Sequence, residues 1–355
     1  MYPSMRETSR LSERKAAILR DLVHLYIRTG EPVGSEALAA QSKLGVSSAT
    51  IRNELAALEE MGYLTQPHTS AGRTPTEIGY RYFVNMLPQR GRLRDQERLA
   101  IVHFFDVALA DVDEILRGTT QLLSRLTRYA SLALVPSARE SDIARAELIR
   151  VGSGTLLLIV FEDGRVEKRL LELPAEAGDE EVESISGLLT ESFSGQPLNV
   201  ARAAASAKAA ISAEPERSVL DRVADALGSI DEAQASEHVY MGGVANIATE
   251  EAFRRRETLR EMLEAIERES EILHLLREAA GSGAVSGAVS VTIGRENPVT
   301  GIWEASMVAA PYEAGGRTLG TIGVVGPLRM DYANAIAAVR AVAERLSAAV
   351  AALGG

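Results

Sequence analysis

Apolar residues recur with helical spacing early in the chain, in the stretch GVSSATIRNELAALEEMGYL that begins at Gly45. Ile51, Leu55 and Leu58 stand at positions i, i+4 and i+7, which places them on one face of a helix. Ser47 precedes them and is a good N-cap, because its hydroxyl can accept a hydrogen bond from an amide of the first turn. We therefore predict a short helix whose apolar face packs inward.

The opposite face of this helix carries Ala49, Arg52, Asn53 and Ala56, given 3.6 residues per turn. Small residues allow a helix to lie deep in a DNA major groove. Arg can bond bidentately to guanine, Asn can do the same to adenine, and Ala can meet a thymine methyl group. When the helix is considered alone, an ordinary solvated surface is the simpler interpretation of Arg52 and Asn53. The segment that follows favours DNA.

A β-hairpin is predicted after the helix. Gly62 is placed to end the helix as a C′ glycine, and Tyr63 to Gln66 is typical of a short strand. Pro75 limits the returning strand. The tip contains no carboxylate and offers donors for phosphates or a minor groove, namely His68, Thr69, Ser70 and Arg73. A helix followed by such a hairpin predicts a winged helix-turn-helix, although the hairpin alone is also compatible with an exposed loop that has one accidental arginine.

The flanking sequence supplies the other helices of such a domain. A first helix has the apolar stripe Ile18, Leu22, Leu25 and Tyr26, and Ser35 is expected to cap a second. Thr76 to Leu87 predicts a last helix. Aromatic and basic residues alternate in this helix. We favour packing of the aromatic side chains in the core of the domain over stacking on nucleic-acid bases. Polar and basic residues at 88–92, with Pro and Gly, mark a domain boundary.

The rest of the chain alternates between helical and strand patterns. Helices are predicted over 95–129 with a break near Ala110, 179–193, 200–227, 250–279 and 332–351. Strands are predicted over 132–136, 146–152, 155–162, 165–173, 239–241, 286–293, 302–310 and 317–326. Strands, a helical block and further strands indicate one sheet domain that carries an insertion.

The distribution of charge is compatible with DNA binding although the whole chain of 355 residues has a net charge of −11. Residues 1–98 contain 14 Lys and Arg against 11 Asp and Glu, a net of +3, and the remainder contains 24 against 38, a net of −14. Local charge decides a contact with phosphates. The start MYPSMRETSR has no apolar core, and the aliphatic run Leu156 to Phe161 is too short to span a bilayer. We expect a cytoplasmic protein without a membrane partner.

Motifs for catalysis, metals or cofactors are not found in the sequence. The chain has no cysteine, and its five histidines show neither HxH nor HExxH spacing. Walker A and GxSxG motifs are missing, and Gly152-Ser153-Gly154 lacks the third glycine and the following helix of a dinucleotide loop. We expect no enzyme activity, no cofactor and no metal.

The run GVSSATIRNELAALEEMGYL, followed by QPHTSAGRTPTEIGYRYFV, resembles the amino-terminal signature of the HrcA family of heat-inducible transcription repressors. The similarity extends over the whole length, with further matches at YMGGVAN (240–246) and GTIGVVGPLRMDY (320–332). The resemblance implies a multidomain α+β fold with a winged helix, a GAF-like α/β domain and a dimerising domain inserted into the latter. It also implies repression of chaperone operons at an inverted-repeat operator called CIRCE, and dependence on the chaperonin.

These expectations assign 1–88 to the winged helix, 89–200 and 285–355 to the GAF-like domain, and 201–284 to the helix-rich dimerising insertion. Double-stranded DNA, a second copy of the chain and the chaperonin are the expected partners. The candidate DNA-binding residues are Ser48, Ala49, Thr50, Arg52, Asn53, His68, Thr69, Ser70 and Arg73. A metabolite-sensing regulator with a ligand in the GAF-like domain is the alternative function.

Overall fold

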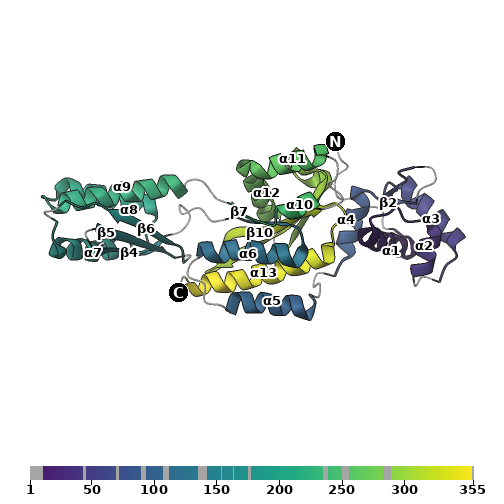
Figure 1. Ribbon diagram of the computed structural model, residues 1–355, viewed down its shortest axis with the longest axis horizontal. Helices are drawn as coiled ribbons and strands as arrows, with labels where there is room; N and C mark the ends of the chain where they lie inside the picture. Colours follow the sequence, from purple (N-terminus) through teal and green to yellow (C-terminus); the bar gives the residue numbers. More distant parts are fainter. Residues whose placement is uncertain are drawn as a thin grey trace.

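The computed structural model describes residues 11–42, 45–68, 72–88, 93–106, 112–134, 142–152, 154–162, 164–174, 177–234, 239–249, 256–282 and 289–353. These residues form three parts in a row, a winged helix at one end, a central domain, and a third part at the other end (Figure 1). The secondary structure is mixed α/β, as the patterns predicted.

The winged helix contains α1 (Glu13–Thr29), α2 (Ser35–Gln41), α3 (Ser48–Glu60), β1 (Leu64–Thr65), β2 (Thr74–Pro75) and α4 (Glu77–Met86). Ser12 caps α1 by accepting a hydrogen bond from the Lys15 amide, and Thr76 caps α4 through the Gly79 amide. Ile18 and Leu22 of α1 are fully buried, and Tyr80 and Phe83 of α4 close the same core. The aromatic residues of α4 therefore pack inward, as expected.

The central domain is built on a five-stranded sheet in the order β7-β3-β10-β9-β8, with every neighbouring pair antiparallel. Its strands are β3 (Ala130–Leu134), β7 (Val239–Gly242), β8 (Ser290–Ile293), β9 (Ala305–Ala314) and β10 (Arg317–Pro327). Its helices are α5 (Asp95–Asp106), α6 (Val112–Thr127), α10 (Ala245–Thr249), α11 (Arg256–Glu267), α12 (Glu269–Ser282) and α13 (Tyr332–Leu353).

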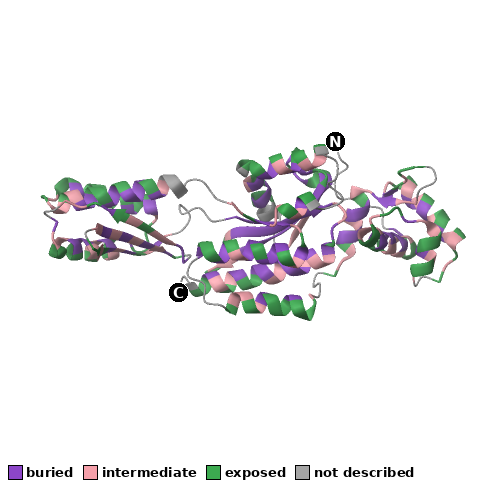
Figure 2. Ribbon diagram, viewed as in Figure 1, coloured by how far each residue is buried: buried purple, intermediate pink, exposed green. Residues whose placement is uncertain are grey.

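Helices cover both faces of this sheet. The long helices α6 and α13 pack on one face, with α5 against α13, whereas α11 and α12 lie over the other face (Figure 1). The inner strands of the sheet are mostly buried between them, whereas the outer strands β7 and β8 are mostly half-buried (Figure 2). The core on the α6 and α13 side is continuous with the core of the winged helix.

The third part, which we call the insert, comprises the described residues between 142 and 234. It contains a separate sheet β4-β5-β6 and three helices, with bounds β4 (Ile143–Val151), β5 (Gly154–Phe161), β6 (Val166–Leu171), α7 (Asp179–Phe193), α8 (Leu198–Ile211) and α9 (Glu216–Gln234). It has its own apolar core, which includes Leu157, Phe161 and Leu189. The chain leaves the central sheet after β3 and returns at β7, its direct neighbour in that sheet.

The limits of the insert differ from those that the sequence predicted. Strands between 146 and 173 were assigned to the central sheet, but in the structure they pair with one another. Residues 201–234 pack with these strands, whereas α11 and α12 pack on the central sheet, so 201–284 is not one unit. The pairing of β3 with β7 encloses the whole insert, and no local pattern in the sequence reveals so distant a partner.

Two predicted helices are also broken. The helix expected over 200–227 is divided into α8 and α9 around Ser212 to Pro215, where proline cannot continue a helical hydrogen-bond ladder. The helix expected over 250–279 is divided into α11 and α12 next to Arg268, and its first residues, 250–255, lie outside the described residues. Its aliphatic seam packs within its own domain, because Ile266 and Leu276 are buried in the core beneath α11 and α12. The boundary at 89–92 and the break near Ala110 also fall outside the described residues.

Candidate nucleic-acid interface

The helix α3 presents the face that the sequence predicted. Ser47 caps it, with the Thr50 amide 3.2 Å from the Ser47 hydroxyl. Ile51, Leu55 and Leu58 are buried against the rest of the winged helix. Ala49, Arg52, Asn53 and Ala56 are all exposed. The outward face of α3 thus combines two long hydrogen-bonding side chains with two methyl groups.

The end of α3 is set by a Schellman motif. Gly62 has φ +79°, its amide bonds to the Glu59 carbonyl, and the Tyr63 amide bonds to the Leu58 carbonyl. Tyr63 and Leu58 are both buried, which supplies the apolar contact of this motif. This turn directs the chain from the helix straight into β1, the first strand of the wing.

The wing is a small sheet of three segments. β1 pairs with β2, and the Val33 and Arg73 backbones exchange two hydrogen bonds of 2.9 Å. A Cβ added at Gly72 would lie 2.4 Å from the Val33 carbonyl carbon, so only glycine allows this close approach. His68 is exposed at the start of the tip, while Thr69 and Ser70 lie outside the described residues.

Arg73 lies at the base of the wing and forms an ion pair. Its Nε is 2.8 Å from Glu59 Oε2, without the angular geometry of a hydrogen bond. The side chain is 21% exposed. No sequence pattern indicates this pairing, because Glu59 and Arg73 are brought together by the turn at Gly62 and the return of the wing.

Two hydroxyls predicted to face DNA are engaged inside the domain. The Ser48 hydroxyl lies 3.1 Å from that of Ser35, which joins the start of α3 to the start of α2. The Thr50 hydroxyl lies 3.0 Å from that of Ser47 within the cap. Both residues are half-buried, and their hydroxyls support the start of the helix. The backbone amides of the first turn that Ser47 does not cap have no partner within the helix.

The acidic residue in the middle of α3 is paired with basic residues of α1. Glu54 lies 2.8 Å from Lys15 Nζ and 3.7 Å from Arg14 Nη1. Together with the pairing of Glu59 to Arg73, this compensates two of the carboxylates on α3. A helix that approaches phosphates benefits from such compensation, because an uncompensated carboxylate would repel the DNA backbone.

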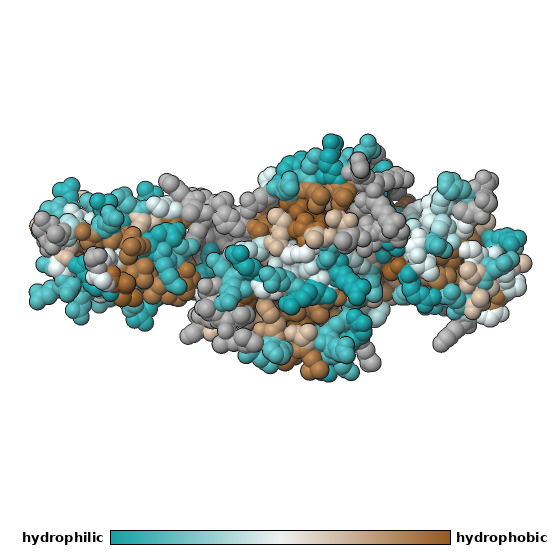
Figure 3. All heavy atoms as spheres, viewed as in Figure 1, coloured by the Kyte–Doolittle hydropathy of each residue, from teal (hydrophilic) through white to brown (hydrophobic). Residues whose placement is uncertain are grey.

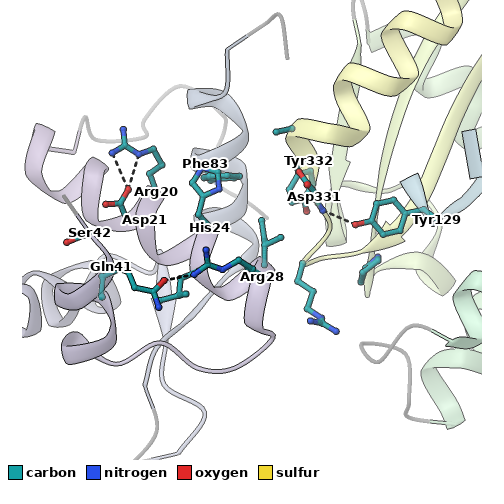
Figure 4. A pocket seen from close by; sticks show the side chains of 16 residues that line it. Arg20, Asp21, His24, Arg28, Gln41, Ser42, Phe83, Tyr129, Asp331 and Tyr332 are labelled. Atoms are coloured by element: carbon teal, nitrogen blue, oxygen red, sulfur yellow. Dashed lines mark hydrogen bonds and ion pairs between the residues drawn. The ribbon is translucent and has the colours of Figure 1, made fainter. Parts of the chain in front are cut away.

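A cleft of about 770 Å³ separates α1 from the start of α13 (Figure 4). On the winged-helix wall the polar side chains pair with one another: Arg20 with Asp21 at 3.2 Å, and Arg28 with Gln41. His24 packs edge-on against the Phe83 ring, and its partial burial lowers its pKa. Among the described residues no cluster of His, Asp or Glu is arranged to hold a metal ion.

Comparison with known proteins decides the family. Residues 10–86 match the model "Winged helix-turn-helix transcription repressor, HrcA DNA-binding", and residues 113–336 match the "HrcA protein C terminal domain". The chain belongs to the HrcA family of heat-inducible transcription repressors. Family members are regulators, and the repressor assignment is favoured over a metabolite-sensing regulator because the similar proteins named below are all heat-inducible repressors.

Two family members illustrate the extent of the match. The chain is 42% identical to the heat-inducible transcription repressor HrcA of Thermobifida fusca, over 94% of this chain and 95% of that protein. It is 35% identical to the repressor of Desulforamulus reducens, over 95% and 96% of the two chains. A crystal structure of a hypothetical protein, 24% identical, superposes with a TM-score of 0.71 over 97% of this chain and 100% of that one, which supports the fold.

The family signature 320–332 lies where the central domain meets the winged helix. Met330 and Tyr332 are buried, and the Tyr332 hydroxyl donates to the Leu328 carbonyl. Burial raises the pKa of Tyr332, so this hydroxyl stays protonated. The Tyr332 ring lies 6.0 Å from that of Tyr80 on α4. The signature is therefore part of an interdomain contact.

The other family signature, 240–246, lies where the chain returns from the insert. Gly243 has φ +64°, and a Cβ there would lie 1.7 Å from the Ser124 hydroxyl of α6. The Asn246 side chain donates to the same hydroxyl at 3.0 Å. These contacts attach the end of β7 to α6. No described helix is long and apolar enough to cross a membrane.

Proposed function

We propose that this repressor reads an inverted-repeat operator of the CIRCE type through the outward face of α3. Arg52 and Asn53 contact base edges, with Ala49 and Ala56 against thymine methyl groups. The observation that carries the proposal is the exposure of these four side chains on a helix whose other face is buried. Backbone amides of Ser48 and Ala49, at the positive end of the helix dipole, contact phosphate, while the Thr50 amide stays with the Ser47 hydroxyl.

The wing supplies backbone contacts beside the recognition helix. His68, Thr69 and Ser70 at its tip contact phosphate or the minor groove. The Arg73 Nε stays with Glu59, and its terminal nitrogens reach a phosphate. The support for these roles is the position of the wing directly after α3 and the absence of any carboxylate between His68 and Arg73 in the sequence.

The central domain is GAF-like in this proposal. Its antiparallel sheet has helices on both faces, which suits a domain that carries an insert on one side and the winged helix on the other. A repressor of chromosomal operons works in the cytoplasm. Chaperonin assists its folding, and heat lowers the population of active repressor, since a loss of about 1–2 kcal/mol shifts such a population several-fold.

The insert carries the dimer interface. The sheet face opposite α7 and α9 has the side chains of Leu156, Leu158 and Val160 of β5 along its middle, and none of these residues is fully buried. Leu170, which pairs with Leu156, is 68% exposed. Such an aliphatic face on a monomer marks an interaction surface. Two copies bring two winged helices to the two halves of an inverted repeat.

Charges of both signs flank this aliphatic face. Glu147 and Lys168 flank Leu158 on opposite sides in the strand register. Arg145 on the same face pairs with Glu147, so no uncompensated carboxylate opposes the meeting of two such faces around a twofold axis. A second copy of the chain therefore fits this surface.

A nuclease footprint of the full-length chain on a CIRCE inverted repeat tests the proposal. We expect two protected half-sites related by the symmetry of the repeat, and much weaker protection of a scrambled duplex with the same composition. Sedimentation at the same protein concentration should give a dimer. Equal protection of both duplexes, or protection of a single half-site by a monomer, would contradict the proposal.

A further inference from the structure

The helix α4 of the winged helix lies along an edge of the central sheet. Among the described strands, β8 is the outer one next to β9, and its outward backbone groups face no further described strand. The Arg81 Nη2 of α4 donates to the Val291 carbonyl of β8 at 2.7 Å. One side chain of the winged helix thus satisfies an edge carbonyl of the central domain.

The same guanidinium also holds a carboxylate. The Arg81 Nε donates to Glu296 Oε1 at 2.8 Å, and Nη2 donates to Glu296 Oε2. Glu296 is held in turn, because its Oε2 accepts from the Ile293 amide at 2.9 Å. We call Arg81, Glu296 and the Val291 carbonyl the clamp. A bidentate, charge-assisted pair of this kind constrains direction as well as distance.

Two neighbouring contacts support the clamp. The Arg295 amide lies 3.3 Å from Glu77 Oε2 at the start of α4. Gly294 has φ +56°, and a Cβ at this position would lie 2.5 Å from the Glu77 carboxyl carbon. On the other side, the Arg329 guanidinium covers Gly30, where a Cβ would lie 2.5 Å from Arg329 Nη1. A cation at that point is favoured by the negative end of the α1 dipole.

Along α1 the winged helix is separated from the central domain by a cleft. The cleft of about 770 Å³ lies between α1 and the start of α13, and the two walls visibly face each other across it in Figure 4. The apolar contact at Tyr80 and Tyr332 resists separation but has little directional preference. The clamp is therefore the contact that best restricts tilting of the winged helix across this cleft.

We propose that Arg81 is a positioning residue for operator recognition, which acts through the clamp to fix the orientation of α3 relative to the central domain. In a dimer this orientation sets the spacing of the two half-sites that can be bound together. The clamp contributes to binding by preorganisation, since a winged helix free to tilt must be ordered at each binding event. This inference rests on the proposed operator-binding function.

The test compares half-site spacing in full-length variants. Binding is measured on a CIRCE repeat, on the same repeat with its spacer lengthened by about five base pairs, roughly half a helical turn, and on a single half-site. We expect Arg81→Ala to reduce discrimination between the two spacings about tenfold, the ratio expected for the loss of one charge-assisted pair. Affinity for the single half-site should stay within about twofold of the wild type.

Further variants separate positioning from folding. Glu296→Gln weakens the clamp from the side of the central domain and should also lower spacing discrimination. Arg81→Lys keeps the charge without the planar fork, so discrimination should be intermediate. Arg98→Ala is the control, since Arg98 pairs only with Asp95 within α5 among the interactions that the structure records. Melting temperatures identify any variant that fails to fold.

A second measurement needs no DNA. The chain has no cysteine, so spin labels can be placed on Glu60→Cys in α3 and Glu344→Cys in α13, both exposed positions. Labelled protein diluted into excess unlabelled chain reports the distance within one protomer. The distance distribution should broaden in Arg81→Ala and stay narrow in Arg98→Ala.

Unchanged spacing discrimination or an unchanged distance distribution in a folded Arg81→Ala variant would overturn the role of the clamp and leave the proposed function intact. A wild-type protein that binds the repeat no better than a scrambled duplex would overturn the proposed function, and the role of the clamp with it. The two failures are therefore distinguishable in one set of titrations.

Discussion

The winged helix and the insert are attached to the central domain in opposite ways. The winged helix shares a continuous apolar core with the α6 and α13 side of the central domain and is joined to it by the clamp. The insert has a separate core and leaves the central sheet only through the neighbouring strands β3 and β7. The two parts lie at opposite ends of the molecule (Figure 1).

This contrast corresponds to two different tasks. A part that reads DNA has to hold its recognition helix at a defined angle, which favours a shared core and directional polar contacts. A part that binds a second copy needs an accessible apolar surface, which favours an independent unit. Exposed aliphatic residues of the insert gather on its open sheet face, with Ile149 and Val151 on β4 and Leu170 on β6. Figure 3 shows brown patches on the insert as well as on the central domain.

Matched phenylalanine substitutions should give the largest effect. Phe83 of the winged helix and Phe161 of the insert are 1% and 0% exposed. Each change to Ala should cost about 3–5 kcal/mol through lost burial and a residual cavity. Calorimetry should show that Phe161→Ala lowers a transition confined to the insert, whereas Phe83→Ala lowers the transition of the winged helix and central domain together. A single shared transition in both variants would mean that the two attachments are equivalent.

Breaking the dimer should have the next largest effect. Leu158→Glu places a charge in the middle of the open insert face, and we expect monomers in sedimentation. Affinity for the full inverted repeat should fall about a hundredfold through lost avidity, with little change on a half-site. Ile211→Glu is the control, since Ile211 is 81% exposed on α8. A dimeric Leu158→Glu protein would place the interface elsewhere.

The winged helix was predictable from the sequence, and the limits of the insert were not. The cap at Ser47, the stop at Gly62 and the stripe of Ile51, Leu55 and Leu58 all depend on residues close in sequence. The strand patterns between 146 and 173 were equally clear, but their partners depended on which strands pair across the fold. The Asp163-Gly164 pair between the strand patterns 155–162 and 165–173 is typical of a hairpin and indicates local pairing. Only the pairing of β3 with β7 shows that the insert is a separate sheet.

The candidate site shows the same division. Exposure of Arg52 and Asn53 followed from helical period alone. The pairs of Glu54 with Lys15 and of Glu59 with Arg73 join different elements, and the Ser48 contact with Ser35 joins two helices. Such contacts depend on tertiary geometry, which no spacing rule supplies. The clamp between Arg81 and Glu296 is the most distant example.

A smaller effect is expected at the wing. Arg73→Ala should lower the slope of log K against log salt by about one unit, the loss of one phosphate contact. Glu59→Gln should leave the slope nearly unchanged, because it removes the partner but keeps the arginine. An unchanged slope for Arg73→Ala would mean that Arg73 only supports the wing through Glu59.

The smallest effect concerns pH and the cleft beside α1. Burial lowers the pKa of His24 from 6.5, and Arg20 acts in the same direction, whereas Asp21 and Asp331 oppose it. The folded state therefore binds fewer protons at His24 than the unfolded state does. The contribution of neutral His24 to the free energy of unfolding is complete above pH 6.5 and declines as the pH falls through the lowered pKa. Melting temperatures of His24→Gln should depend less on pH across this window than those of the wild type or of His103→Gln. Identical pH profiles for all three proteins would show that His24 does not contribute.

Base reading by α3 is tested most directly by competition between operator and scrambled DNA. Arg52→Ala and Asn53→Ala should each cost about 1–3 kcal/mol of operator binding, with little change in binding to scrambled duplex. Arg98→Ala, an exposed arginine on α5, is the matched control and should behave as the wild type. Loss of discrimination in the two α3 variants alone is the result that we predict. Wild-type discrimination in both of them would contradict the assignment of α3 as the recognition helix.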